Sequence, residues 1–177
     1  EKEGGEELKQ LNQRFTSLEN AARIQKEPQF GYHSQIVKDA DSVKWVEVDL
    51  GGESSIESIE LQACHDEYAN IGAGFGFPVR YRVELFRGVN DASAHYVIDR
   101  TDEDQKNPGL QPVRIEFDSP QSVRRIRVTA VKLMERKNDF HFSLAELRVM
   151  GVGGENIARD CQVKSLDSIE APIRWAK

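Results

Sequence analysis

From Phe30 onward, hydrophobic and polar residues alternate in short runs, and this period of two is typical of half-buried β-strands. The clearest run is KWVEVDLG, Lys44 to Gly51, which interleaves Glu47 and Asp49 with a core-facing set: Trp45, Val46, Val48 and Leu50. The pattern predicts strands at Val43–Leu50, Ile56–Ala63, Val79–Phe86, His95–Asp99, Val113–Phe117, Val123–Val131 and Ser143–Met150. Gly, Pro, Asn and Asp fill the gaps and no helical pattern intervenes, so we expect an all-β protein, an antiparallel β-sandwich.

The two ends of the chain differ from this pattern. Between Glu6 and about Gln25, apolar residues recur at spacings of three and four, which predicts an amphipathic helix ending before Pro28. We interpret residues 1–29 as a helical connector that packs on a domain, with a small oligomerisation element as the alternative. Residues 30–152 form the predicted sandwich. Residues 153–177 are either a C-terminal strand and tail or the start of a second module.

Composition narrows the functional classes. The chain has 177 residues, of which 38% are hydrophobic and 31% charged, as in an ordinary soluble domain with one main core. A net charge of -6 argues against sequence-independent binding to nucleic acid. No run of 18 apolar residues is present, so no transmembrane segment is predicted. The chain begins at Glu1 instead of Met, and we expect a processed or excised part of a longer protein.

Several chemistries are excluded by spacing. Cys64 precedes His65, but Leu61 stands where a covalent haem motif needs its first cysteine, so we expect no haem on this segment. The glycines of GAGFGFP, Gly72 to Pro78, lead into a strand instead of a helix, which excludes a phosphate-binding loop. No nucleophile or zinc motif accompanies the histidines, so no enzyme activity is expected. Whether Cys64 and Cys161 pair is left open.

The strand motifs carry a family resemblance. KWVEVDLG and the segment from Arg124 to Met150, RRIRVTAVKLMERKNDFHFSLAELRVM, resemble the opening and closing signatures of the discoidin domain, also called the coagulation factor five/eight type C domain. That family includes the family 32 carbohydrate-binding modules. The resemblance covers about Phe30 to Gly151 and implies a galactose-binding-like jelly roll that binds ligands through loops at one end. The motifs GYHS, GAGFGFPVRYRVE and RKNDFHFSLAEL also look like modules of large bacterial, planctomycete multidomain proteins, some with cytochrome domains.

Two loops then become candidate ligand sites. The first follows Ala63, and its polar and aromatic side chains offer the donors, acceptors and apolar face that a pyranose needs: His65, Asp66, Tyr68 and Asn70. The second lies between the last predicted strands and gathers charged and aromatic groups: Arg136, Lys137, Asn138, Asp139, Phe140 and His141. The alternatives are a solvated polar loop and a hairpin tip whose Phe140 and Phe142 enter the core.

The resemblance also implies a structural calcium ion. The matching positions are Asp39, Asp41 and Glu146, whose oxygen atoms suit a hard cation. The alternative is that these are ordinary surface carboxylates, with Glu146 paired to a nearby Arg. Together these features predict a non-catalytic module that binds a glycan or polysaccharide within a larger secreted, periplasmic or cell-surface protein. The alternative is a structural module that docks neighbouring domains through Leu8, Phe15 and Leu18.

Overall fold

The computed structural model describes residues 11–14, 30–67 and 70–169. The chain divides into two units, the first comprising Glu1–Glu27 and Glu170–Lys177 and the second Pro28–Ile169. In the first unit residues 11–14 are helical, while the rest of the predicted helix, with Leu8, Phe15 and Leu18, lies outside the described residues. None of the described helices is long and apolar enough to cross a membrane. The following paragraphs concern the second unit.

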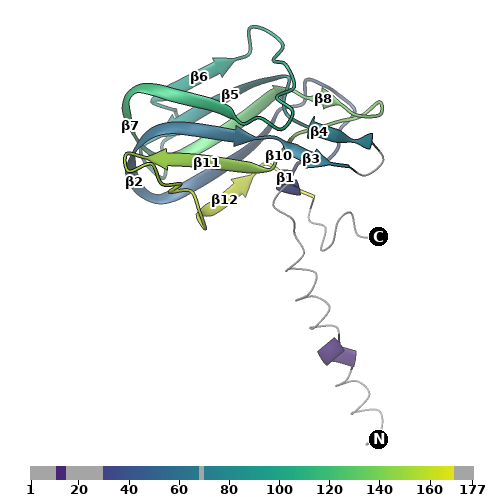
Figure 1. The fold of residues 1–177 in the computed structure, drawn as a ribbon, viewed down its shortest axis with the longest axis horizontal. Helices are drawn as coiled ribbons and strands as arrows, with labels where there is room; N and C mark the ends of the chain where they lie inside the picture. Colours follow the sequence, from purple (N-terminus) through teal and green to yellow (C-terminus); the bar gives the residue numbers. More distant parts are fainter. Residues whose placement is uncertain (1–10, 15–29, 68–69, 170–177) are drawn as a thin grey trace, which may run out of the picture. The chain divides into compact units, whose positions relative to one another are not determined.

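One antiparallel sheet of six strands forms the framework of the second unit (Figure 1). Its strands follow the order β11 (Glu146–Gly151), β2 (Lys44–Gln62), β7 (Val113–Lys132), β5 (Arg80–Phe86) and β6 (Tyr96–Arg100). The sixth strand, β12 (Gln162–Ser165), also pairs with β2, beside its first half, whereas β11 pairs with the second half. Within the described part of the segment that follows residue 152, β12 thus lies against the sandwich.

The longest strands, β2 and β7, each join two of the predicted strands. In β2 the predicted break at Gly51 and Gly52 is a bend instead, where the register with β7 shifts between Asp49 and Ser54. Gly51 has φ +81°, a conformation that glycine adopts without steric cost and that turns the strand while it remains extended. Both strands curve across the molecule, as Figure 1 shows for β7.

The core lies between the two halves of these bent strands. Val46 and Val128 from one half and Ile59 and Ile115 from the other belong to the same buried cluster, so the sheet closes on itself as a two-layered sandwich. The predicted antiparallel β-sandwich is therefore confirmed. Val83, Leu85 and Val149 are further fully buried members from the remaining strands, and Phe142, which lies outside the strands, is fully buried as well.

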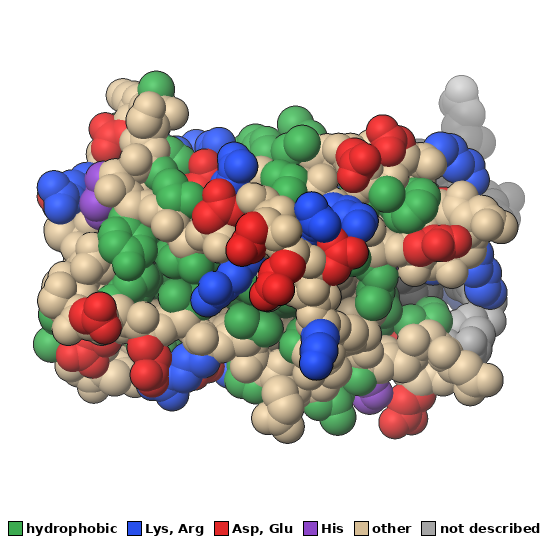
Figure 2. All heavy atoms as spheres, turned by 90° about the horizontal axis from the view of Figure 1, so that it is seen from above, with side chains coloured by type: hydrophobic (Ala, Val, Ile, Leu, Met, Phe, Trp, Pro, Cys, Tyr) green, Lys and Arg blue, Asp and Glu red, His purple; other side chains and the backbone are tan. Residues whose placement is uncertain are grey.

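The opposite face of β2 is more enclosed than simple alternation predicts. Trp45 was predicted to face the core, and this prediction is wrong. Trp45 alternates with Val46 and lies on the outer face, where Arg127 Cζ is 4.4 Å from the centroid of its ring. Glu47 is also buried there, since Arg125 and Arg127 both donate to it. Arg125 further donates to the carbonyls of Gly88 and Asp91, so the β5–β6 connection is held over this face. Across the face shown in Figure 2, acidic and basic side chains are interspersed.

Short strands complete one end of the sandwich. The segments predicted to be loops form two hairpins, β3 (Cys64–Asp66) with β4 (Gly72–Phe75) and β8 (Met134–Glu135) with β9 (Phe140–His141). Near them β1 (Tyr32–His33) pairs with β10 (Ser143–Leu144). The side chains of these segments are therefore positioned by backbone pairing. Cys64 and Cys161 are both free thiols.

Candidate functional site

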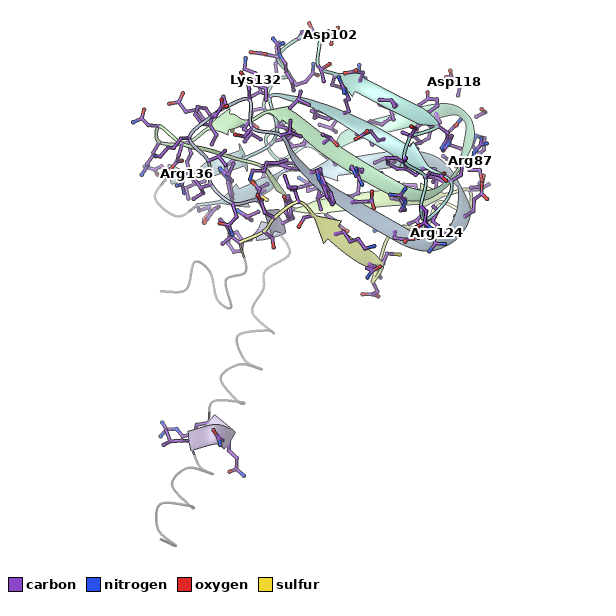
Figure 3. All side chains as sticks on the ribbon, turned by 180° about the vertical axis from the view of Figure 1, so that it is seen from behind. Arg87, Asp102, Asp118, Arg124, Lys132 and Arg136 are labelled. Carbon is purple, nitrogen blue, oxygen red and sulfur yellow. The ribbon has the colours of Figure 1, made fainter. Side chains whose placement is uncertain are left out.

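The two hairpins meet at one end of the sandwich, and we call this region the hairpin end: β3–β4, β8–β9 and their turns. The amide of Ser143 donates to the carbonyl of Gly76 at 2.8 Å, and its hydroxyl donates to the carbonyl of Phe75 at 2.7 Å. The Phe75 and His141 ring centroids lie 6.2 Å apart. Both views of the ribbon place these hairpins together, with Arg136 at this end and Arg87 and Arg124 at the other (Figures 1 and 3).

Gly76 permits this close approach. It has φ +69°, and a Cβ at this position would lie 2.7 Å from His141 Nε2 and overlap the Ser143 hydroxyl. Only glycine fits both the backbone conformation and the space. The glycines of GAGFGFP therefore bring the two hairpins into contact, and Phe77, buried in the core, anchors the crossing.

The candidate residues of the first hairpin differ in their burial. His65 is partly buried and pairs with Ala73 across the hairpin. Asp66 is only 1% exposed, whereas Asn70 is exposed in the turn with φ +58°. Tyr68 lies outside the described residues. Within the described part of this hairpin, His65 and Asn70 are the candidates that reach solvent.

The second hairpin has a preorganised charged tip. Arg136 donates from Nε and Nη2 to the two carboxylate oxygens of Asp139, each at 2.9 Å. This bidentate pair lowers the pKa of the Asp139 carboxyl to about 2, mainly through the hydrogen bond from Arg136. Asn138 sits between them at the tip, exposed with φ +58°, and its carbonyl accepts a long 3.5 Å hydrogen bond from Lys38. Lys137 is exposed beside it.

Two members of this hairpin face inward. Phe140 is partly buried against the core and forms a β-bridge with Val37, so it fixes the hairpin to the segment after β1. His141 is 4% exposed, and burial lowers the pKa of its imidazole to about 4. Phe140 and His141 therefore pack against the rest of the sandwich, while Arg136, Lys137 and Asn138 are exposed.

A buried aromatic centre joins the hairpins, and of its members only His141 was predicted as a site residue. The His33 and His141 rings are stacked with centroids 6.0 Å apart and an interplanar angle of 12°. Phe75 lies beside His33 at 5.6 Å, and Cys64 Sγ is 4.0 Å from His33 Nε2. The motif GYHS contains His33, but two adjacent residues of a short strand carry no periodic signal that marks a partner in distant β9.

A third segment borders the same end and was also missed. In the β6–β7 connection, Asn107 donates from Nδ2 to the carbonyl of Ala73 at 3.2 Å, so this connection touches β4. Asp104 accepts hydrogen bonds from Arg80 at 2.6 Å and from Lys132 at 2.9 Å. In the sequence, the run of Asp, Glu, Lys and Asn in this connection indicated only a turn. Its contacts could not be predicted, because the residues that Asp104 and Asn107 bind are far away in the sequence.

The expected calcium ligands do not assemble as a side-chain cluster. Glu146 accepts from Arg148 at 3.0 Å, and Asp39 accepts the amide of Asp41 at 3.0 Å. Within residues 11–14, 30–67 and 70–169, no three His, Cys, Asp or Glu side chains gather so as to hold a metal ion. The described structure thus does not bring Asp39, Asp41 and Glu146 into one such cluster, and calcium binding stays a prediction.

Structural comparison identifies the fold. A family 32 carbohydrate-binding module from Clostridium perfringens NanJ, solved in complex with galactose, superposes with a TM-score of 0.51 at 18% identity, over 72% of this chain and 81% of that one. A second family 32 module, from a family 31 glycoside hydrolase of the same organism, gives a TM-score of 0.48 at 19% identity, over 70% and 83% of the two chains. A chitosan-binding module from Paenibacillus gives 0.46 at 16% identity, over 64% and 72%.

No family model and no curated protein matches the sequence. The first of the three structures establishes the architecture: the sandwich has the galactose-binding-like fold of the family 32 modules. The predicted fold is confirmed to that level.

Proposed function

We propose that this chain is a non-catalytic carbohydrate-binding module of a larger secreted or periplasmic protein, and that its hairpin end binds a glycan. The observation that carries the proposal is the fold it shares with a family 32 module that was solved in complex with galactose. The geometry supports the location, because two hairpins and the β6–β7 connection meet at one end of a rigid sandwich.

The chemistry at the hairpin end suits sugar hydroxyls. His65 offers a ring nitrogen, Asn70 and Asn138 offer amides that both donate and accept, and Lys137 offers an ammonium group. Arg136 has two of its three guanidinium nitrogens committed to Asp139, which holds the fork in place and leaves Nη1 for a ligand. Asp66, Phe140 and His141 have a supporting role in this proposal because they are wholly or partly buried.

Asn138 is the most informative residue to change. Its φ of +58° lies in the left-handed region, which glycine tolerates, so Asn138→Gly removes the amide and keeps the turn. A lost amide hydrogen bond to a ligand weakens affinity by about tenfold, corresponding to about 1.4 kcal/mol. His65→Ala tests the first hairpin in the same way.

The experiment is a glycan array followed by calorimetric titration of the selected saccharide. Asp118→Asn is the matched control, because Asp118 is exposed and lies at the end away from Arg136 (Figure 3). We expect a dissociation constant at least about tenfold higher for Asn138→Gly and His65→Ala and unchanged for Asp118→Asn. A folded wild-type protein that binds no saccharide on the array, or variants that bind as tightly as the wild type, would refute the proposal.

A further inference from the structure

The two buried histidines stand at the point where the hairpins are joined. His33, on β1, is 7% exposed and His141, on β9, is 4% exposed, and their rings are nearly parallel. The Nδ1 of His141 is buried, and no group among the described residues hydrogen-bonds to it. Two neutral imidazoles stack without cost, whereas two imidazolium ions at this separation repel each other and lose their hydration.

The groups that act on His141 do little to compensate an added positive charge on its ring, because burial and the nearby cationic groups all disfavour the charged form. From β3 the Cys64 thiol faces His33, and burial raises its pKa to about 12, so it is uncharged. From β4 the neighbour is the Phe75 ring. The turn of the second hairpin brings Arg136, which disfavours the charged imidazole of His141, and Asp139, which favours it but is already bound by that Arg136.

The hydrogen bonds that join this end of the sandwich lie next to the two histidines in the chain. Ser143 follows His141 closely in the chain and supplies both hydrogen bonds to the first hairpin, at Gly76 and Phe75. On the other side, the amide of Ser34, next to His33, donates to the carbonyl of Phe142 at 2.8 Å. These hydrogen bonds lie one or two residues from the two rings, so we expect a separation of the rings to weaken them.

We propose that the stacked pair His33–His141 is an acid-sensitive lock, which holds the two hairpins together at neutral pH and opens the hairpin end when it is protonated. The long sheet pairing of β2 with β7 lies outside this centre, so the opening is local. The resulting loss of glycan affinity at acid pH rests on the proposed function, but the opening does not.

The direction and size of the pH effect on opening follow from the linkage between opening and protonation of His141. The folded-state pKa of His141, about 4, lies below its ordinary value of 6.5, so the open state binds more protons between these two pH values. The closed state is fully favoured above pH 6.5 and loses its advantage as the pH falls toward 4. Between pH 7 and pH 4.5, protonation of His141 alone raises the population of the open state by roughly fiftyfold.

The test is amide hydrogen exchange at pH 7 and pH 4.5, corrected for intrinsic exchange rates. We expect exchange to accelerate by at least tenfold at the amides of Ser34, Phe142 and Ser143, and to stay unchanged at the β2–β7 pairs around Val128. The His141 ring signals, followed by NMR, should titrate only in this acid range. Unchanged protection at pH 4.5, or a His141 imidazole that titrates near 6.5 with the hairpins still closed, would overturn the lock.

Two variants sharpen the result. His141→Phe keeps an aromatic ring that cannot be protonated, and it should abolish most of the acid-induced acceleration. His95→Gln removes an exposed histidine and should leave the acceleration as in the wild type. If His141→Phe does not fold, the wild-type titration alone decides. If the hairpin end opens at acid pH but no saccharide binds at any pH, the proposed function is refuted and the acid-sensitive lock stands. If a saccharide binds normally but amide protection does not depend on pH, the lock is refuted and the proposed function stands.

Discussion

Replacing Glu47 by Gln tests whether the outer face of β2 is held by a buried charge. Glu47 is 4% exposed and accepts from Arg125 Nη1 at 2.9 Å and from Arg127 Nε at 2.9 Å. The side chain of Arg125 is 8% exposed, so it cannot recover its hydration when the carboxylate is lost. Breaking a buried ion pair by removing one partner costs about 3 to 5 kcal/mol. Gln keeps one acceptor oxygen, so we expect a loss of about 3 kcal/mol, at the lower end of that range.

Urea unfolding measures this loss. With a slope of about 2 kcal/mol/M, the midpoint should fall by about 1.5 M while the slope itself stays constant. Glu116→Gln is the control, since Glu116 is 71% exposed and pairs with Arg114 at 3.0 Å; its midpoint should hardly move. A Glu47→Gln midpoint within about 0.3 M of the wild type would show that the two arginines do not depend on this carboxylate, and would refute the reasoning.

Three further measurements test other parts of the structure. Gly76→Ala should destabilise the protein by about 3 kcal/mol, from left-handed backbone strain and the clash with His141 and Ser143, whereas Gly109→Ala, with φ +63° but open space, should cost only about 1 kcal/mol; equal melting temperatures would contradict this difference. In a thiol-reagent assay on the native protein only the partly exposed Cys161 should react quickly, because Cys64 is buried and burial raises its pKa to about 12; two fast thiols would disprove that burial. Calcium bound by the folded state would raise the melting temperature, so an unchanged melting temperature in millimolar calcium would remove the calcium prediction.

The sandwich was predictable because its strands carry a local signal. Val46, Val48 and Leu50 alternate with polar residues, and each strand's period of two reports its own buried face. The merging of neighbouring strands into β2 and β7 was not predictable in this way. A pair of glycines is compatible with a chain break and with a bend, and only pairing with the partner strand decides between them.

Trp45 shows a second limit of pattern analysis. Its hydrophobicity suggested a core position, but its parity on β2 places it on the outer face, where Arg127 covers the ring. Arg127 is 82 positions away from Trp45 in the sequence, so the local pattern of KWVEVDLG does not predict their contact. Burial on the outer face thus arises from long-range ion pairs and cation–π contacts, which hydrophobic periodicity does not record.

The candidate site was predictable as two segments but not as an arrangement. The density of polar and aromatic residues marked both hairpins in the sequence. Which side chains point outward depends on contacts between them: His141 is buried by His33 and Phe75, and Arg136 is bound by Asp139. The contributions of His33 and Asn107 were missed because each acts on a strand distant in sequence.

The most direct test of the account is an amide chemical-shift titration of the ¹⁵N-labelled protein with galactose and with the tightest-binding saccharide of the array. The account predicts saturable shifts at the amides of β3, β4, β8 and β9 and their turns, with Asn138 among the largest, and little change elsewhere. Shifts centred on the outer face around Trp45 and Arg127, or no shifts with any saccharide while the spectrum stays that of a folded protein, would contradict it.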